Sequence, residues 1–220
     1  TPRGGVRAEF TVYEWAPGRF YLVSAGAYER HDHDYLRKLC PTDGSVRLNA
    51  ITTRFGVLVL AGPNSRKVLQ KLTDADLSNE AFPWLSGKEI SVGTCSAHAL
   101  RVNFVGELGW EFHHPIEQQV ALFDQLMEAG KEFGIRPYGI KAMSSLSIEK
   151  SYRLVPRELS IEYSAYESGL DRFVHPNKGQ FIGRDALVAG REKGLAWNFV
   201  TLEVHGVTDA DSDARGSEPI

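Results

Sequence analysis

Hydrophobic and polar residues alternate near the start of the chain and predict a β-hairpin. Residues 6–12 alternate in a β-rich stretch, and a second apolar run covers residues 20–23. The sequence Ala16-Pro17-Gly18-Arg19 between them is typical of a turn. The following stretch, residues 29–39, is polar with few apolar anchors, which predicts a surface helix.

The middle of the chain predicts further strands and helices. Two strands are expected within residues 45–60, and another pair at residues 89–92 and 98–105. A short helix is expected after Gly62-Pro63, because proline is favoured in a first helical turn. A longer helix before Gly130 is predicted from one apolar stripe at helical spacing, which consists of Ile116, Val120, Phe123 and Met127.

The last third of the chain continues this mixture. Helices are predicted over residues 141–151, with Met143, Leu146 and Ile148 pointing inward, and over residues 183–194. Short strands are predicted at residues 173–174 and 197–204. Because strands and helices do not alternate in a strict βαβ rhythm, the pattern favours an α+β fold over a doubly wound sheet.

Composition and charge exclude several classes of protein. The 220 residues are 42% hydrophobic and 24% charged, which is close to the globular average and unlike a disordered or collagen-like chain. A net charge of −3 does not fit a nucleic-acid partner. Apolar runs fall far short of the ~20 residues that span a bilayer, so no membrane partner is expected. The two cysteines, Cys40 and Cys95, fit a reduced interior compartment.

The ends of the chain suggest a piece of a longer polypeptide. The sequence begins Thr1-Pro2-Arg3 without a Met or an apolar signal region, and it ends just after a turn-rich acidic stretch, residues 208–213. A segment outside this sequence could therefore carry part of the active site.

Common cofactor motifs and metal motifs are missing from the sequence. No GxGxxG, GxxxxGK[ST] or GxSxG pattern is present. His31 and His33 lie two positions apart on the predicted helix, so their side chains diverge by roughly 200°. We therefore expect a solvated helix face there, and no metal site.

The carboxylates Glu111 and Glu9 are candidate functional residues. Glu111 lies between Trp110 and Phe112, and a carboxylate in apolar company must be paired or hydrogen-bonded. It could grip a planar N–H/NH₂ edge in a bidentate manner, or form a structural ion pair with Arg101 or another basic residue. Glu9 shares one face of the first predicted strand with other polar residues, so it is either part of a polar edge or a functional carboxylate.

A third charged pair has an ordinary structural explanation. Glu149 and Arg153 are four residues apart, which is the spacing of a helical salt bridge.

Five stretches, in order along nearly the whole chain, resemble one known family. The family comprises the tetrahydrofolate-binding region of dimethylglycine and sarcosine dehydrogenases and the related aminomethyltransferase, or T protein, of the glycine cleavage system. Each motif alone is weak, but five in the same order are specific. The matching stretches are residues 1–12, 61–69, 101–111 with its GELGWE core, 145–150, and 167–170 with 178–184.

The resemblance implies a fold and a domain organisation. We expect the T-protein-like folate-binding fold, with mixed antiparallel sheets and packed helices. Residues 1–195 would form the folate-binding region, with two subdomains and a truncated N-terminal part. Residues 196–220 would begin a C-terminal β-barrel that this chain mostly lacks. FAD would belong to a separate flavin domain that precedes this region.

The resemblance also implies an activity and its residues. The expected reaction transfers one carbon from a small N-methyl amine, such as dimethylglycine or sarcosine, to tetrahydrofolate and gives 5,10-methylene-tetrahydrofolate. Glu9 would be the catalytic carboxylate near N5 and N10, and Glu111 would hold the aminopyrimidine edge of the pterin. The folate-binding positions implied by the motifs are Ala8, Glu9, Phe10, Phe104, Glu111, Phe112, His113 and Arg172.

Two positions depart from the family pattern and leave alternatives open. Ser147 stands where the family usually has Arg, and Arg172 replaces what is often an aromatic residue. Serine cannot replace the bidentate donor that Arg provides. A demethylase acting on another methyl donor, or a folate-binding module without turnover, therefore remains an alternative. The expected compartment is the cytoplasm, or the mitochondrial matrix in a eukaryote.

Overall fold

The computed structural model describes residues 1–206, which form two compact units. Unit 1 combines Thr1–Thr11 and Leu22–Ser24 with the described chain from Ser151 onward. Unit 2 combines Val12–Tyr21 with Ala25–Lys150. Each unit therefore contains segments that are far apart in the sequence.

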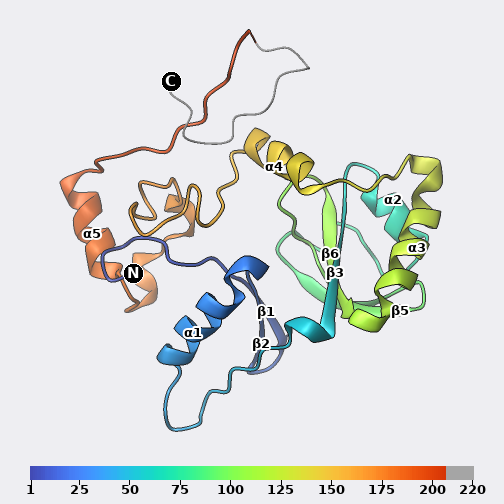
Figure 1. The fold of residues 1–220 in the computed structure, drawn as a ribbon, viewed down its shortest axis with the longest axis horizontal. Helices are drawn as coiled ribbons and strands as arrows, with labels where there is room; N and C mark the ends of the chain where they lie inside the picture. The colour runs from blue at the N-terminus through green and yellow to red at the C-terminus, as the bar shows by residue number, and fades with distance from the viewer. Residues whose placement is uncertain (207–220) are drawn as a thin grey trace. The chain divides into compact units, whose positions relative to one another are not determined.

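Unit 2 is built on a four-stranded antiparallel sheet with the strand order β3-β6-β5-β4 (Figure 1). Its strands are β3 (Phe55–Ala61), β4 (Gly87–Val92), β5 (Cys95–Leu100) and β6 (Gly109–Pro115). The register sets Val59 opposite Glu111, and His98 opposite His113. Since successive side chains of a strand point to opposite faces, Glu111 and His113 share one face of the sheet.

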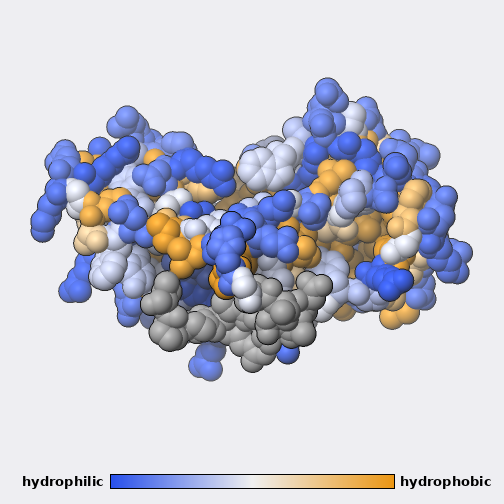
Figure 2. Space-filling view, turned by 90° about the horizontal axis from the view of Figure 1, so that it is seen from above, coloured by the Kyte–Doolittle hydropathy of each residue, from blue (hydrophilic) through white to orange (hydrophobic). Residues whose placement is uncertain are grey.

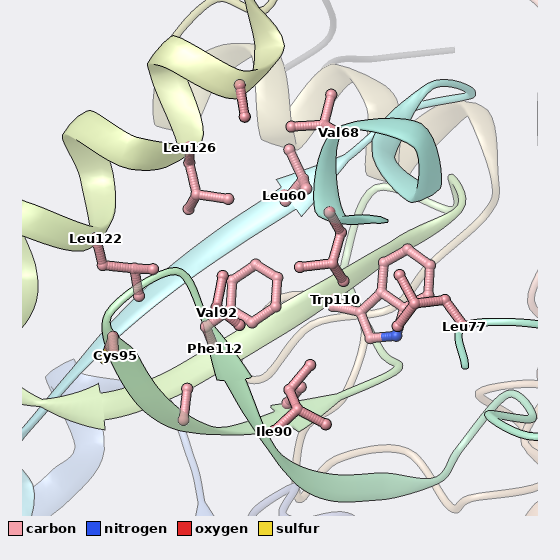
Figure 3. Packing of buried hydrophobic residues seen from close by; sticks show 14 of the residues in the cluster. Leu60, Val68, Leu77, Ile90, Val92, Cys95, Trp110, Phe112, Leu122 and Leu126 are labelled. Carbon is pink, nitrogen blue, oxygen red and sulfur yellow. The ribbon is translucent and has the colours of Figure 1, made fainter. Parts of the chain in front are cut away.

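The other face of the sheet carries the hydrophobic core of unit 2. Helices α2 (Ser65–Gln70) and α3 (Gln119–Gly130) supply the side chains that pack against it. Figure 3 shows Phe112 and Val92 of the sheet beside Leu122 and Leu126 of α3. Trp110 and Phe112 are both fully buried there, which anchors the central strand β6 on its core face.

A two-stranded hairpin contributes aromatic residues to the face opposite the core. Its strands are β1 (Thr11–Ala16) and β2 (Arg19–Val23). The Trp15 ring lies 3.9 Å from the His98 ring, measured between centroids. The Tyr21 ring lies 5.3 Å from the His113 ring in an edge-on arrangement. Helices α1 (Glu29–Leu39) and α4 (Ile140–Glu149) complete the regular elements of unit 2.

Unit 1 consists mostly of turns and irregular segments around α5 (Arg184–Lys193). An isolated antiparallel bridge pairs Gly5 with Ser164, and the Val6 amide donates to the Ser160 carbonyl at 2.9 Å. Gly5 permits this pairing because a Cβ at its position would collide with the Ile161 carbonyl oxygen.

Apolar side chains are not confined to the core. On the face drawn in Figure 2, hydrophobic residues form several patches separated by hydrophilic ones. None of the helices within residues 1–206 is long and apolar enough to cross a membrane.

Several local predictions are confirmed. The antiparallel sheets with packed helices are consistent with the expected α+β class. The turn at residues 16–19 joins β1 to β2, and the predicted helix over residues 29–39 is α1. The first strand, however, begins at Thr11 rather than at residue 6, and residues 45–60 contain one strand, β3, rather than two.

The predicted inner face of α3 is wrong. Leu122, Leu126 and Ala129 face the core, whereas Val120 is 71% exposed. The segment carries two apolar stripes at helical spacing, and only packing against the sheet selects one of them. The predicted inner face of α4 is also partly wrong. Ile148, which was expected to point inward, is exposed, and Ser147 is buried instead.

Two predicted strands near the C-terminus are also wrong. Residues 171–173 form a 3₁₀ turn, and no strand forms over residues 197–204. A strand requires a partner for its backbone groups, and no described strand pairs with this segment. The predicted barrel segment, residues 196–220, extends beyond the described residues from residue 207 onward.

Candidate functional site

Glu111 is a nearly buried carboxylate on the sheet face opposite the core. Its side chain comes from the central strand β6, and the residue is only 8% exposed. One carboxylate oxygen, Oε2, lies 3.4 Å from Nε2 of His113, which is itself completely buried. The other ring nitrogen of His113, Nδ1, lies 3.2 Å from the Tyr21 hydroxyl. Tyr21, His113 and Glu111 therefore form a polar chain, which we call the Tyr21–His113–Glu111 chain.

The sequence left open an ion pair of Glu111 with Arg101 or another basic residue, and the structure gives Arg101 other partners. Its guanidinium donates to the Phe82 carbonyl and, at 2.8 Å, to Oδ1 of Asn79. Within residues 1–206, the ion pair of Glu111 is the one with His113. Glu111 therefore forms no ion pair with Arg101.

Two tyrosine hydroxyls near Glu111 remain protonated at neutral pH. Burial raises the pKa of Tyr21, and the charge of Glu111 raises it further. The same two causes, in the same order, raise the pKa of Tyr138. A protonated Tyr21 can donate to His113 Nδ1. Neither carboxylate oxygen of Glu111 has a hydrogen bond to the described residues, and Oε2 has only its 3.4 Å approach to Nε2 of His113.

The loop before β6 is organised by Asn103. Its Oδ1 accepts from the amides of Val105 and Gly106, both at 3.0 Å, and its Nδ2 donates to the Glu107 carbonyl at 2.7 Å. These bonds hold the loop that carries Phe104, whose side chain is 41% exposed. An exposed aromatic ring on an ordered loop is available for stacking against a ligand.

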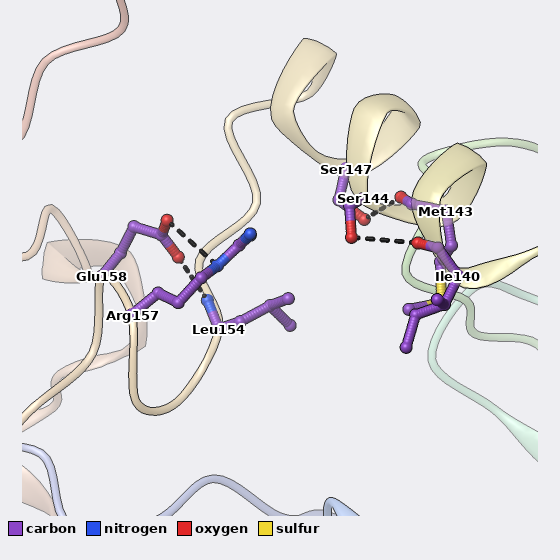
Figure 4. Close-up of polar contacts among 7 residues, drawn as sticks. All are labelled: Ile140, Met143, Ser144, Ser147, Leu154, Arg157 and Glu158. Carbon is purple, nitrogen blue, oxygen red and sulfur yellow. Dashed lines mark hydrogen bonds and ion pairs between the residues drawn. The ribbon is translucent and has the colours of Figure 1, made fainter. Parts of the chain in front are cut away.

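Ser147 supports this loop from α4. Its hydroxyl lies within hydrogen-bond distance of two carbonyls, those of Phe104 and, at 2.8 Å, Met143; Figure 4 shows the second contact. The Ser147 side chain is completely buried. It therefore ties α4 to the Phe104 loop and does not face solvent.

The remaining expected folate residues lie in unit 1. Ala8 and Phe10 are half-buried, and Glu9 presents an exposed surface between them. The surrounding protein nevertheless raises the pKa of the Glu9 carboxyl, because partial desolvation disfavours its charged form. Arg172 is exposed, and its guanidinium lies 4.6 Å from the centre of the Phe173 ring.

The expected site residues divide between the two units of the chain. Glu111 and His113 are brought together in unit 2, whereas Phe112 of the same strand points into the core on the other face. Ala8, Glu9, Phe10 and Arg172 belong to unit 1. Sequence reasoning missed Tyr21 and Tyr138, because no local signal links either one to Glu111.

The predicted salt bridge between Glu149 and Arg153 does not have the expected helical basis. Helix α4 ends at Glu149, so the two residues do not share a helix. Residues 1–206 hold no group of three or more His, Cys, Asp or Glu side chains arranged to bind a metal ion.

Tyr21→Phe is expected to destabilise unit 2 by about 1–2 kcal/mol, because it leaves a fully buried histidine nitrogen without its partner. Urea unfolding followed by circular dichroism measures this change. Tyr28→Phe is the matched control, since its ring also lies edge-on to a histidine, His31, at 6.1 Å but its hydroxyl has no hydrogen bond in the described structure. Equal stability of the two variants would contradict the polar chain.

Comparison with known proteins identifies relatives of the whole chain. The model of the family described as "GCVT N-terminal domain" matches residues 1–178. Human mitochondrial dimethylglycine dehydrogenase is 41% identical over 222 residues, covering 100% of this chain and 25% of the relative. Mouse mitochondrial sarcosine dehydrogenase is 35% identical, covering 92% of this chain and 24% of the relative. This chain therefore spans about a quarter of the length of these dehydrogenases.

Shorter relatives and a solved structure agree with this assignment. An aminomethyltransferase of Thermoanaerobacter sp. (strain X514) is 33% identical, covering 91% of this chain and 54% of the relative. The crystal structure of glycine cleavage system aminomethyltransferase T from Bartonella henselae superposes with a TM-score of 0.73 at 23% identity, covering 88% of this chain and 51% of that one. The structural match shows the fold, and the sequence matches confirm the resemblance that the motifs indicated. These relatives are enzymes, and the chain belongs to the GCVT N-terminal domain family.

Proposed function

We propose that this chain is the tetrahydrofolate-dependent one-carbon transfer region of a larger protein. It would direct a carbon from a small N-methyl amine, of the dimethylglycine or sarcosine kind, to tetrahydrofolate and give 5,10-methylene-tetrahydrofolate. The observation that carries the proposal is Glu111, a nearly buried carboxylate whose Oε2 lies 3.4 Å from Nε2 of His113 and whose two oxygens accept no hydrogen bond from the described residues. A chain of this family with such a carboxylate is suited to hold a pterin.

The proposed role of Glu111 is recognition of the ligand's planar edge. An aminopyrimidine presents neighbouring N–H and NH₂ donors, and an ionised carboxylate can accept from both. His113 is fully buried behind Glu111, so we propose that it positions the carboxylate and does not touch the ligand. Phe104 is proposed to stack on the ligand from its loop. For Phe112, which faces the core, we propose no ligand contact.

The proposed role of Glu9 is proton transfer. A carboxyl whose pKa is raised toward neutrality accepts a proton more effectively than an ordinary glutamate. Tetrahydrofolate supplies the N5 and N10 nitrogens that take up the carbon. Glu9 would accept a proton there and stabilise a positively charged iminium donor, while Ala8 and Phe10 would flank the ligand.

The rest of the longer protein is proposed to supply the oxidation. The dehydrogenase relatives are about four times as long as this chain, which supports fusion to a flavin domain that would hold FAD. The relatives are named as mitochondrial proteins, so we propose the mitochondrial matrix for a eukaryotic source and the cytoplasm otherwise.

Glu9→Gln tests the division of roles between the two glutamates. We expect tetrahydrofolate to bind this variant within about threefold of the unaltered affinity, because the pterin grip is intact. Formation of 5,10-methylene-tetrahydrofolate from dimethylglycine, followed by chromatography in the longer protein, should fall by about 100-fold, the range of a lost general base. Unaltered turnover in Glu9→Gln would contradict the catalytic role of Glu9.

The replacement of the family's Arg by Ser147 leaves a second function as an alternative. Because a buried Ser147 replaces the Arg usual in the family's SLRxEK motif, the methyl donor of this chain can differ from that of its relatives. A demethylase would release product only with another donor, whereas a folate-binding module would bind tetrahydrofolate and give no product with any donor. Testing the unaltered protein with dimethylglycine, sarcosine and other methyl donors distinguishes these alternatives.

A further inference from the structure

Two arginines of unit 2 share one neutral hydrogen-bond acceptor. Nη2 of Arg66, on helix α2, donates to Oδ1 of Asn79 at 2.7 Å. Nη2 of Arg101, which directly follows strand β5, donates to the same oxygen at 2.8 Å. Because both guanidiniums contact one atom, the two positive charges lie side by side. Asn79 belongs to the loop between α2 and β4, so three segments that are separate in the sequence meet at this point.

No carboxylate neutralises the arginine pair within residues 1–206. Neither Arg66 nor Arg101 forms an ion pair there. Asp76, three residues before Asn79, instead accepts from a backbone amide at 2.8 Å, and the neighbouring Glu80 is exposed. Burial lowers the pKa of Arg101, and the charge of Arg66 lowers it further. A bound anion would offset this repulsion between like charges.

Most hydrogen-bond donors of the cluster are unused. A guanidinium carries five N–H donors, and buried donors in folded proteins are normally paired. Within the described chain Arg66 donates only to Asn79, and its buried Nε has no partner. Arg101 donates to Asn79 and to the Phe82 carbonyl. The exposed amide NH₂ of Asn79 adds further donors, so the cluster offers donors of three side chains to an anion.

Arg101 is fixed in position before any ligand binds. Its Cζ lies 5.8 Å from the centre of the Trp110 ring, and its backbone amide donates to the Ser86 carbonyl at 2.9 Å. A donor group that is already held in place loses little conformational freedom on binding. Trp110 is fully buried in the core, on the side of the sheet opposite Glu111. The arginine cluster is therefore separate from the proposed pterin grip and does not rest on the proposed function.

We propose that Arg66, Asn79 and Arg101 form a binding site for a phosphate group. Two planar guanidinium forks and an amide can donate to several oxygens of a tetrahedral oxyanion. A phosphate monoester carries a charge of about −1.5 to −2 at pH 7, which matches two guanidiniums, whereas a carboxylate carries one charge and two oxygens. The phosphate is either free or the end group of a small phosphate monoester, and both sources share this chemistry.

Calorimetric titration of the chain tests the site with three probes. They are inorganic phosphate, glycerol 3-phosphate, and acetate as a carboxylate with a single charge. Ionic strength is kept constant, because salt screens exposed charges. We expect saturable phosphate binding and an acetate affinity at least about 10-fold weaker. Binding of glycerol 3-phosphate as well would identify a monoester site, and its exclusion would identify a site for free phosphate.

Arg66→Gln should weaken phosphate binding by at least about 10-fold, because it removes one charge and one fork. Arg66→Lys, which keeps the charge without the fork, should lie between Arg66→Gln and the unaltered chain. Arg66 is the arginine to change, since Arg101 also holds the Phe82 carbonyl and its loss would disturb the fold. Arg47→Gln is the matched control, because Arg47 is an exposed arginine of unit 2 without an ion pair in the described residues.

Asn79→Asp provides a second test with the opposite effect on stability. It places a carboxylate where both guanidiniums already donate, so the phosphate-free chain should unfold about 2–4 °C higher. Its phosphate affinity should fall by at least about 10-fold, and phosphate should no longer raise the unfolding temperature. Asn49→Asp adds the same charge at an exposed asparagine of unit 2 whose side chain has no hydrogen bond within residues 1–206, and it should change neither property.

Three results would overturn the proposal. The first is no saturable binding of either phosphate compound to the folded, unaltered chain. The second is equal phosphate affinity of that chain and of a folded Arg66→Gln variant. The third is acetate binding as tight as phosphate binding, which would remove the assignment to phosphate. Tetrahydrofolate titrations of Arg66→Gln and Asn79→Asp should match the unaltered chain, so this site and the proposed function fail independently.

Discussion

Glu111→Gln is expected to weaken tetrahydrofolate binding by about 100-fold while the chain stays folded. Glutamine keeps one acceptor oxygen but places an NH₂ donor where the second carboxylate oxygen was, so it opposes a donor of the aminopyrimidine edge. Loss of a charge-assisted hydrogen bond costs about 1.5–3 kcal/mol, and each 1.4 kcal/mol is about tenfold in affinity. The similar size of Gln keeps the sheet packing around β6 intact.

The measurement is a calorimetric titration with tetrahydrofolate, supported by tryptophan fluorescence. Trp15 lies on the same side of the sheet as Glu111, with its ring 5.3 Å from that of Tyr21, and should report the ligand. Glu107→Gln is the matched control, because Glu107 is an exposed glutamate of the same GELGWE motif. If Glu111→Gln binds like Glu107→Gln, Glu111 does not hold the pterin, and the main support for the proposed function is lost.

Sequence reasoning succeeded where structure is local. The turn at residues 16–19 and the polar helix α1 depend on residues that are neighbours along the chain. Proline and glycine restrict the backbone of the turn directly, and the polar composition of α1 already places it at a surface. The family resemblance succeeded for a different reason, since five ordered motifs identify a fold without any physical derivation of its packing.

Sequence reasoning failed where a choice depends on distant partners. Both apolar stripes of α3 satisfy helical spacing, and contact with the sheet decides that Leu122 and Leu126 are buried. The link between Tyr21 and His113 joins residues 92 positions apart. No periodicity along one segment can predict such a pair, so the support behind Glu111 emerged only from the three-dimensional arrangement.

The alternation of side chains along β6 separates Glu111 from Phe112, whereas the motif resemblance placed both at the folate site. Glu111 and Phe112 are adjacent on a strand, so their side chains must point to opposite faces. A pterin grip by Glu111 therefore already argued against Phe112 in the same pocket. The structure places the Phe112 side chain in the core, where it holds the strand in position.

Phe112→Ala is accordingly expected to reduce the free energy of unfolding by about 3–5 kcal/mol. The side chain is 0% exposed and packs with apolar residues of the sheet and of α3, as Figure 3 shows, so truncation leaves a cavity that its neighbours fill only in part. That loss is a large share of the ~5–15 kcal/mol that stabilises a typical domain. Urea unfolding followed by circular dichroism and tryptophan fluorescence measures it.

Phe104→Ala is the control that separates core packing from ligand contact. Phe104 is 41% exposed on its loop, so its loss should change stability by less than about 1 kcal/mol and should weaken tetrahydrofolate binding. Phe112→Leu should do the opposite, with some loss of stability and unchanged affinity, because its side chain faces away from Glu111. Weakened folate binding in a stable Phe112→Leu variant would return Phe112 to the ligand site and would contradict the two-faced arrangement of β6.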